Sequence, residues 1–239
     1  KPRTLLLTGA SRGIGHATVR RFNREGWRVI TCSRQPFPDE CPWGGGEENH
    51  VQIDLSDPQR TIAAVEQIRA RLGGRLDALV NNASVFYPNP TSEASSDDWD
   101  RIMHTNLKAP FFLLKACLPA LEESTGNVVN LIDIYSEKPL PEHPLYCASK
   151  AGLAALTRSW AKDHAPGIRV NGVSPGAILW PEGEAEIDTV YQQAILDKTP
   201  LARTGNPDDI AGAIAYLLCD APFVTGQILS VDGGRSLNM

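Results

Sequence analysis

The chain has 239 residues, a formal net charge of −5 at pH 7, and hydrophobic residues at 42% of its positions. This length is sufficient for one α/β domain with a sizeable core and is short for two. The acidic balance gives no electrostatic reason to expect nucleic acid or an anionic membrane as a partner.

Short aliphatic runs alternate with longer segments of helical periodicity along the chain. The predicted strands are Thr4–Thr8, Arg28–Cys32, Val51–Asp54, Ala78–Asn81, Asn127–Ile132, Arg169–Val173 and Ile228–Val231. The predicted helices cover residues 14–25, 58–72, 96–123, 145–164 and 207–219, and a Pro/Gly-rich loop covers Gln35–Asn49. This alternation indicates a parallel sheet covered by helices on both faces. Right-handed crossovers then place a ligand at the carboxyl ends of the strands.

A glycine-rich turn follows the first strand and leads directly into a helical pattern. It reads Thr8-Gly9-Ala10-Ser11-Arg12-Gly13-Ile14-Gly15, which is GxxxGxG rather than GxGxxG spacing. Glycines allow a tight turn and close approach of a pyrophosphate, and the helix N-terminus offers free N–H groups. The order of strand, turn and helix predicts a dinucleotide site.

The second strand ends without an acidic residue. Ser33 and Arg34 stand there, and the next acid is Asp39. A carboxylate at this place would bind the ribose hydroxyls of NAD and repel a 2′-phosphate. Guanidinium groups at Arg12 and Arg34 instead pair with phosphate oxygens. The pattern therefore predicts NADPH, with ordinary surface charges as the alternative interpretation of both arginines.

Tyr146 and Lys150 are four residues apart, so they share one face of the predicted helix. A positive charge so close favours the phenolate, and we expect it to lower the pKa of Tyr146 from about 10. Such a tyrosine is a proton donor for a reduction. Asp133 lies thirteen residues upstream of the tyrosine.

These motifs resemble the short-chain dehydrogenase/reductase family when they are taken with Asn81-Asn82-Ala83, Asn106 and Pro175-Gly176. The resemblance covers essentially the whole chain. It implies a single-domain Rossmann fold over residues 1–239, nicotinamide-dependent redox chemistry, and a homotetramer paired through the helices at 96–123 and 145–164. The implied catalytic residues are Asp133, Tyr146, Lys150 and Asn106, the last supporting a water chain to Lys150. The implied cofactor-binding residues are Gly9, Arg12, Gly13, Ile14, Gly15, Ser33, Arg34, Asp54, Leu55, Asn82, Ala83, Tyr146, Lys150, Pro175 and Gly176.

Asp133 occupies the position at which most members of this family carry a serine that hydrogen-bonds a substrate carbonyl. An aspartate here resembles the pteridine reductase branch. Further similar segments are residues 82–88, 175–182 and 231–237, with a lid at about 180–200. The resemblance implies reduction of a C=N bond in a dihydropterin or folate-like substrate, with hydride from NADPH and a proton from Tyr146. The implied substrate-binding residues are Ser84, Phe86, Asp133 and Tyr146.

One departure from the branch leaves alternatives open. Gly13 stands where the branch carries a second basic residue, and the stretch before Asn81 is more similar to other branches. A general carbonyl or 3-oxoacyl reductase is one alternative, and a non-catalytic NADP-binding sensor is another. Phe86 is expected to stack on the pterin, although residue type alone favours a core aromatic at this position.

The five cysteines are scattered, at Cys32, Cys41, Cys117, Cys147 and Cys219. No pair has CxxC spacing and no His/Cys cluster predicts a metal, so we expect buried thiols in a reducing compartment such as the cytoplasm. The longest apolar stretch is too short to span a bilayer, and the start shows no signal-peptide pattern.

Overall fold

The computed structural model describes residues 2–36, 46–180 and 188–239, and it contains one seven-stranded parallel sheet in the order β3-β2-β1-β4-β5-β6-β7. The strands are β1 (Thr4–Thr8), β2 (Arg28–Ser33), β3 (His50–Gln52), β4 (Ala78–Asn81), β5 (Asn127–Leu131), β6 (Arg169–Pro175) and β7 (Ile228–Val231). This order is that of the doubly wound Rossmann fold, so the predicted fold class is confirmed. β1 pairs with both β2 and β4, which puts the reversal of strand order at the glycine turn.

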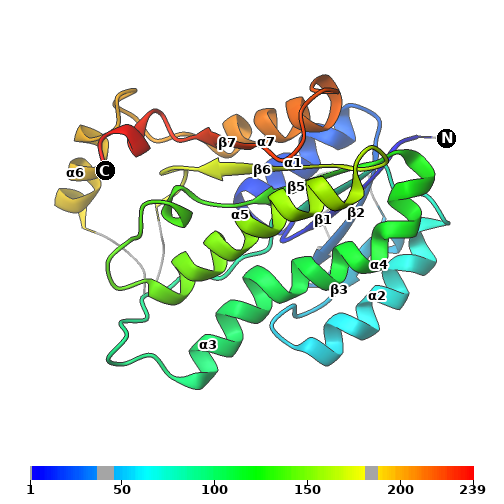
Figure 1. Ribbon diagram of the computed structural model, residues 1–239, viewed down its shortest axis with the longest axis horizontal. Coiled ribbons are helices and arrows are strands. Elements are labelled where there is room, and N and C mark those ends of the chain that lie inside the picture. Colours follow the sequence, from blue (N-terminus) through cyan, green and yellow to red (C-terminus); the bar gives the residue numbers. More distant parts are fainter. Residues whose placement is uncertain (1, 37–45, 181–187) are drawn as a thin grey trace.

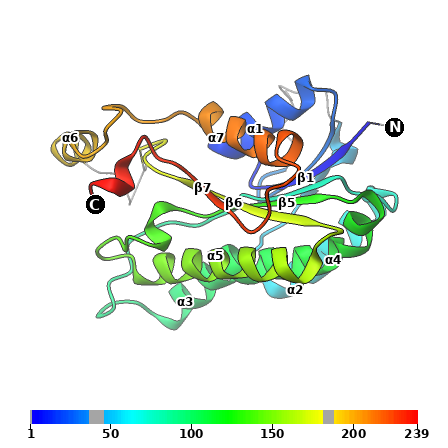
Figure 2. The same cartoon turned by 45° about the horizontal axis from the view of Figure 1, so that its top comes forward.

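Helices cover both faces of the sheet (Figures 1 and 2). They are α1 (Gly13–Arg24), α2 (Pro58–Leu72), α3 (Ser96–Met103), α4 (Ala109–Ser124), α5 (Pro144–His164), α6 (Thr189–Asp197) and α7 (Pro207–Ala215). Figure 2 shows α1 and α7 on one face and α2, α4 and α5 on the other. Each face therefore has its own hydrophobic core.

Strand β1 shows how one short sequence serves both cores. Leu5 and Leu7 pack in the core beneath α1 and α7, whereas Leu6 packs in the core beneath α2, α4 and α5. All three side chains are fully buried. Successive side chains of a strand point to opposite faces, so a central strand covered on both sides needs an unbroken apolar run.

Capping residues set several helix starts. Asp57 accepts hydrogen bonds from the main-chain N–H groups of Gln59 and Arg60 at the start of α2, where Pro58 takes the first helical position. Asn206 and Asp209 form a capping box at the start of α7. Such caps satisfy N–H groups that have no partner within the helix.

Two predicted helices are interrupted, and one helix, α6, was not predicted. The expected helix at 96–123 consists of α3, a π-helical turn at His104–Lys108, and α4. The expected helix at 207–219 likewise ends in a π-helical turn at Tyr216–Asp220. Strand β3 starts one residue earlier and ends two residues earlier than predicted, and β6 extends two residues further.

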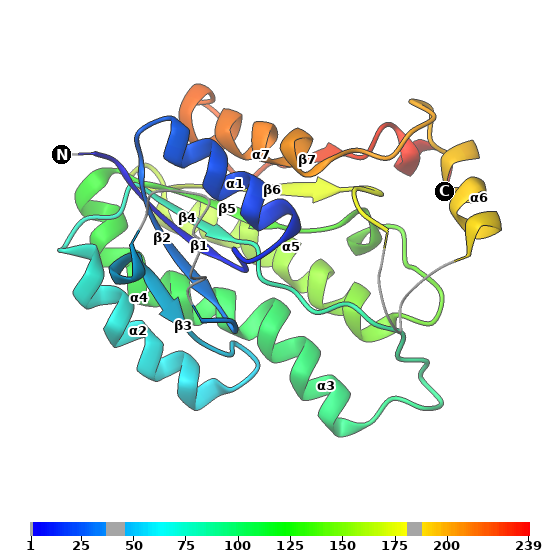
Figure 3. The ribbon, with the colours of Figure 1, turned by 180° about the vertical axis from the view of Figure 1, so that it is seen from behind.

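Helix α6 lies away from the body of the sheet, beside the C-terminal segment (Figures 1 and 3). Asn238 donates to the carbonyl of Lys198, and the N–H of Leu201 donates to the carbonyl of Gly233. The predicted lid includes residues 181–187, which lie outside the described residues, as do residues 37–45 of the predicted loop. Of the expected lid, the structure thus describes Trp180 and the part that contains α6.

Candidate functional site

The glycine turn is held in place by the residues that follow β4. Gly9 has φ +70° and Gly13 has φ +55°, a region that favours glycine. The side-chain amide of Asn82 donates to the carbonyls of Thr8, at 3.0 Å, and Gly9, at 2.8 Å. A Cβ atom at Gly15 would lie 2.0 Å from the carbonyl oxygen of Gly9. The turn therefore needs glycine where the sequence has it.

The N-terminus of α1 fits a phosphate group. Arg12 precedes the helix in an extended conformation, and no side-chain cap binds the first N–H groups of α1. Uncapped N–H groups and the helix dipole favour an anion at this end. Gly9, Arg12, Gly13, Ile14 and Gly15 thus form a cradle of the kind that a dinucleotide pyrophosphate requires.

The ends of β2 and β3 place the remaining predicted cofactor residues. Ser33 ends β2 and donates to the carbonyl of Gln35, while the side chain of Arg34 is exposed. Asp54 accepts from the main chain and hydroxyl of Ser56. Burial raises the pKa of Asp54, but these bonds and the charge of Arg34 outweigh burial and hold the pKa below its usual value. The side chain of Leu55 is buried in the core.

The end of β6 completes the carboxyl edge. Gly176 donates its N–H to the carbonyl of Val231, and a Cβ atom there would lie 2.7 Å from the Cα atom of Asp232. Glycine at this place allows the ends of β6 and β7 to approach closely, directly after Pro175. The predicted residues from β1, β2, β4, β5 and β6 thus follow the same edge of the parallel sheet.

A buried polar group lies at the end of β5. The hydroxyl of Tyr146 donates to Oδ2 of Asp133 at 2.7 Å, and the main-chain N–H of Tyr135 donates to Oδ1 at 2.9 Å. The ammonium of Lys150 donates to the carbonyl of Leu131 at 2.8 Å and lies 5.7 Å from the centre of the Tyr146 ring. The structure therefore brings together the three predicted catalytic residues Asp133, Tyr146 and Lys150.

The predicted direction of the Tyr146 pKa is wrong for this arrangement. Burial, and then the adjacent negative charge of Asp133, raises the pKa of Tyr146 well above its ordinary value. Burial raises the pKa of Asp133 to about 6, against the opposing effects of its hydrogen bonds. Burial lowers the pKa of Lys150 to about 8, against the charge of Asp133. Between about pH 6 and about pH 8 the site therefore combines the carboxylate of Asp133, the neutral phenol of Tyr146 and the ammonium of Lys150.

Asn106 is buried in the π-helical turn and fixes the segment that follows β4. Its Oδ1 accepts from the N–H of Val85 and the hydroxyl of Ser84, and its Nδ2 donates to the carbonyl of Val85 and the hydroxyl of Ser149. These bonds join that segment to α5. The expected water chain from Asn106 to Lys150 stays a prediction.

Phe86 contacts Tyr146 directly. Its ring stands edge-on to the Tyr146 ring, with centres 4.8 Å apart, and stacks on His143 at 4.7 Å with an angle of 14° between the planes. Phe86 is half-buried. One face of the Phe86 ring is therefore occupied by His143, a neighbour that the sequence did not indicate.

Arg235 is the main site residue that the sequence reasoning missed. It follows Gly234 in a short helical turn, Arg235–Leu237, and its side chain is buried. Its guanidinium donates to the hydroxyl of Tyr135 at 3.4 Å and to the carbonyl of Ile195 in α6 at 3.3 Å. The only signal in the sequence was its place in the segment 231–237, which resembles the pteridine reductase branch.

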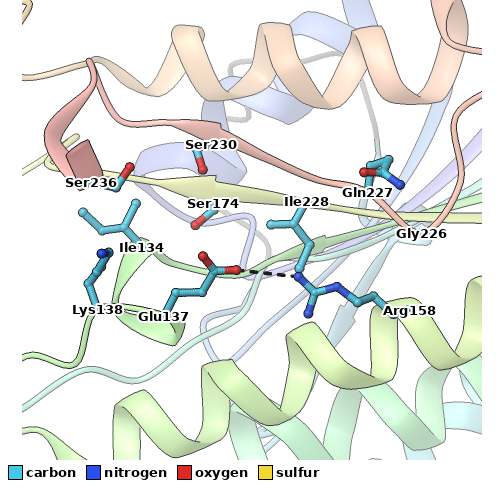
Figure 4. Close-up of a pocket in the computed structure, with 10 residues that line it drawn as sticks. All are labelled: Ile134, Glu137, Lys138, Arg158, Ser174, Gly226, Gln227, Ile228, Ser230 and Ser236. Atoms are coloured by element: carbon cyan, nitrogen blue, oxygen red, sulfur yellow. Dashed lines mark ion pairs between the residues drawn. The ribbon is translucent and has the colours of Figure 1, made fainter.

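A separate cavity of about 170 Å³ lies beside β7 (Figure 4). Glu137 and Arg158 line it and form an ion pair at 3.6 Å, with Lys138 and Ser236 nearby. Neither Asp133 nor Tyr146 lines this cavity, so it is distinct from the site at the sheet edge.

Other predicted features concern the chain as a whole. Cys32, Cys117 and Cys147 are buried free thiols, as expected, whereas Cys219 is a free thiol that is only half-buried, and Cys41 lies outside the described residues. Within the described part of the chain, no group of three or more His, Cys, Asp or Glu residues could hold a metal ion. None of the helices described there is both long and apolar enough to cross a membrane.

A Rossmann sheet with a glycine turn at its switch point and a Tyr–Lys pair beside it defines a class of dinucleotide-dependent oxidoreductases. The chain belongs to the short-chain dehydrogenase/reductase family: residues 9–236 match the family model described as enoyl-(acyl carrier protein) reductase.

Similar proteins align with nearly the full length of the chain. Protein FixR of Bradyrhizobium diazoefficiens is 42% identical over 99% of this chain and 88% of its own length. The 3-oxoacyl-[acyl-carrier-protein] reductase FabG of Thermotoga maritima is 33% identical over 96% of both chains. A short-chain dehydrogenase/reductase from Brucella ovis, solved with a partially ordered NAD, has a TM-score of 0.81 and 41% identity, and the match covers 97% of this chain and 100% of that one. Ligand-free aldohexose dehydrogenase of Thermoplasma acidophilum has a TM-score of 0.88 and 31% identity, with 100% and 96% of the two chains covered.

Proposed function

We propose that this protein is an NADPH-dependent reductase of a dihydropterin or folate-like substrate. The observation that carries the proposal is the carboxylate of Asp133, bonded to the hydroxyl of Tyr146 at 2.7 Å. An ionised carboxylate only accepts hydrogen bonds, whereas a serine hydroxyl can also donate to a carbonyl oxygen. A pterin ring offers amino and ring N–H donors, so its chemistry fits an acceptor at this position.

The proposed cofactor fits the residues at the sheet edge. The glycine turn and the uncapped start of α1 would hold the pyrophosphate, and Asp54 would lie near the adenine. Arg12 and Arg34 would pair with the 2′-phosphate of NADPH. The partially ordered NAD in the Brucella ovis relative supports a nicotinamide dinucleotide here. When bound, this group supplies the hydride.

The residues of the chain would position the substrate and supply the proton. Tyr146 donates its hydroxyl proton to a ring nitrogen, directly or through water. Because the hydroxyl has one proton, its bond to Asp133 is given up when that proton moves to the substrate. Asp133 would then accept from a substrate N–H, and Lys150 would hold the nicotinamide ribose. Its ammonium also supplies the positive charge that favours loss of the Tyr146 proton. Ser84 and Phe86 line the substrate side, and α6 belongs to the lid.

Reduction of a carbonyl group is the second candidate. The FabG relatives of this chain favour it, because they match almost its whole length. Asp133 disfavours it at neutral pH, because a carboxylate cannot donate to a carbonyl oxygen. In this candidate Asp133 must be protonated, and activity on ketones is expected to rise as the pH falls toward about 6.

A substrate panel tests the proposal. NADPH oxidation is followed with dihydrobiopterin, dihydromonapterin, dihydrofolate, a set of ketones and a 3-oxoacyl thioester. We expect turnover with a pterin or folate, and roughly a 10²–10⁴-fold loss in Asp133→Ser with NADPH binding unchanged. Turnover of the ketones or the thioester alone would replace the pterin proposal with the carbonyl one. Full pterin turnover by Asp133→Ser would refute the role of the aspartate.

We also propose a homotetramer. The outer surface of α3 and α4 exposes Trp99, Phe111 and Phe112, with exposures of 51%, 42% and 38%. These three side chains line an apolar groove together with Leu107 and with Leu156 of α5. Large aromatic side chains gathered on one surface are typical of protein interfaces.

A further inference from the structure

Arg235 carries a charge into the interior next to the candidate site. Its residue exposure is 6%, and its buried Nε has no hydrogen-bond partner. Across the parts of the chain that the structure describes, no carboxylate lies within ion-pair distance of this guanidinium. Burying an arginine in this way is costly, so a buried arginine is expected to perform a specific task.

The contacts of Arg235 lead to Asp133 in two steps. The guanidinium donates to the hydroxyl of Tyr135, and the N–H of Tyr135 donates to the carboxylate of Asp133. Tyr135 therefore joins the C-terminal turn to Asp133, with its hydroxyl bound to Arg235 and its main-chain N–H bound to the carboxylate. Tyr135 belongs to the one-turn helix Ile134–Ser136, which follows Asp133 directly.

The other contact of Arg235 reaches the lid. Nη1 donates to the carbonyl of Ile195, in the last turn of α6. Positive charge is favourable at the C-terminal end of a helix, where carbonyl groups lack partners. One side chain thus binds the end of α6 and the turn that carries Asp133.

We propose that Arg235 is a positioning residue that couples the lid helix α6, through Tyr135, to the carboxylate of Asp133. This inference rests on the proposed role of Asp133 in the reaction. The inference gives the C-terminal turn a role in the site, although Arg235 contacts Tyr135 and Ile195 rather than the reacting groups.

The charged and titratable groups around Asp133 come from several elements. Tyr146, Cys147 and Lys150 belong to α5, Tyr135 to the turn after β5, and Arg235 to the C-terminal turn, while Tyr191 of α6 acts on Tyr135. Burial raises the pKa of Asp133 to about 6, and the charges of Lys150 and Arg235 oppose that rise. Removal of the Arg235 charge is therefore expected to raise this pKa further.

The test needs a measurement that is independent of turnover. The Asp133 carboxyl carbon is titrated by carbon-13 NMR in wild-type protein, with Asp133→Asn to assign its resonance. We expect Arg235→Gln to move the Asp133 titration to higher pH and Arg235→Lys to leave it close to wild type. Arg203→Gln is the matched control, because it removes an exposed arginine that pairs with Asp209. This control should leave the titration unchanged.

Kinetics test the positioning itself. We expect Arg235→Gln to lower kcat about tenfold or more, the effect of losing a hydrogen bond to a charged group. Tyr135→Phe should lower kcat too, and the double variant should lose less than the product of the two single effects. Arg235→Lys keeps the charge but loses the forked geometry of the guanidinium. Its pH profile should therefore stay close to that of wild type, whereas its kcat should remain lowered.

The outcomes separate this inference from the proposed function. An unchanged Asp133 titration in folded Arg235→Gln overturns the inference, whatever substrate the enzyme reduces. A shifted titration in a protein that reduces no pterin supports the coupling and refutes the pterin proposal. A rise in KM confined to substrates that bear a carboxylate, without a change in kcat, would overturn the inference in favour of direct substrate binding by Arg235.

Discussion

Asp133 is a carboxylate whose surroundings disfavour its ionised form. Its pKa is about 6 in the folded protein, against about 3.9 in an unfolded chain. The folded state therefore binds the extra proton between these values, and stability falls as the pH rises through about 6. The residue that the proposed chemistry requires is thus a source of instability at neutral pH.

Asp133→Asn should stabilise the protein at the expense of activity. We expect the variant to exceed wild type by about 2–3 kcal/mol in free energy of unfolding at pH 8, with the difference vanishing below pH 4. Urea unfolding at several pH values measures it, with the exposed Asp100→Asn as a control. A difference that stays constant with pH would show that the ionisation of Asp133 is not its cause.

Phe86 has an aromatic neighbour on one face and Tyr146 at its edge. Offset stacking adds about 0.5–1.5 kcal/mol beyond the buried area. A pterin that binds between Phe86 and the nicotinamide also loses water from both of its faces. We therefore expect Phe86→Ala to raise the KM for a pterin by tens-fold and to change the KM for a small ketone little. Phe86→Leu, which keeps bulk without an aromatic face, is the matched variant.

Thermal unfolding distinguishes the other interpretation of Phe86. The stacked pair with His143 makes a purely structural role plausible on geometry alone. In that case Phe86→Ala lowers the melting temperature and affects all substrates alike. Such a result would remove the aromatic support for a flat heterocyclic substrate.

At the site, the sequence could predict residue identity better than residue environment. The four-residue spacing of Tyr146 and Lys150 predicted correctly that they lie together, and the family resemblance implied Asp133 beside Tyr146, where the structure has it. The sign of the Tyr146 pKa shift depends on burial and on the contact with Asp133, which no spacing reveals. Arg235 reaches Tyr135 across one hundred residues of sequence, so no local pattern marks it.

At the scale of elements, we expect the residues at the strand ends to set the preference between NADPH and NADH. Arg34 follows β2 and Arg12 precedes α1, so both guanidiniums flank the proposed adenosine end. A charge-assisted contact contributes about 1.5–3 kcal/mol, so two such contacts to a 2′-phosphate would give a preference for NADPH of about a hundredfold or more.

Substitutions at these two ends test the preference. Arg12→Gln and Arg34→Gln should each reduce the ratio of kcat/KM for NADPH over NADH by about tenfold or more. Arg24→Gln, at the far end of α1, should leave the ratio unchanged. Equal kcat/KM for the two cofactors in wild type would contradict the proposal.

Helix boundaries show why periodicity predicts elements better than their interruptions. A π-helical turn adds a residue to a helix without changing the residue types around it. The pattern at 96–123 therefore predicts one helix, although Asn106 lies in such a turn. Helix α6 has one local signal, Asp188, whose side chain caps it at Tyr191. A single cap was insufficient to predict the helix.

At the scale of the whole molecule, the exposed aromatic surface of α3 and α4 predicts an assembly. Phe112→Asp should weaken subunit association by tens-fold or more, because a charge would enter an apolar interface. Sedimentation across a concentration series measures the change. Phe223→Asp, at a fully exposed residue near β7, is the control. A wild-type monomer at working concentration would rule out the tetramer.

The pairing of β1 with β4 has a consequence for how the protein folds. Leu5 pairs with Ala78, and the amide of Asn82 braces a turn 73 residues earlier in the chain. Bringing β1 and β4 together closes a long loop, and this costs chain entropy before any contact between the two strands forms. This cost slows folding. The phosphate cradle therefore exists only in molecules that have completed this step. A dinucleotide that binds this cradle should then stabilise the folded protein, because it binds the folded state and not the unfolded chain, and the stabilisation should grow with the logarithm of its free concentration even after the site is saturated.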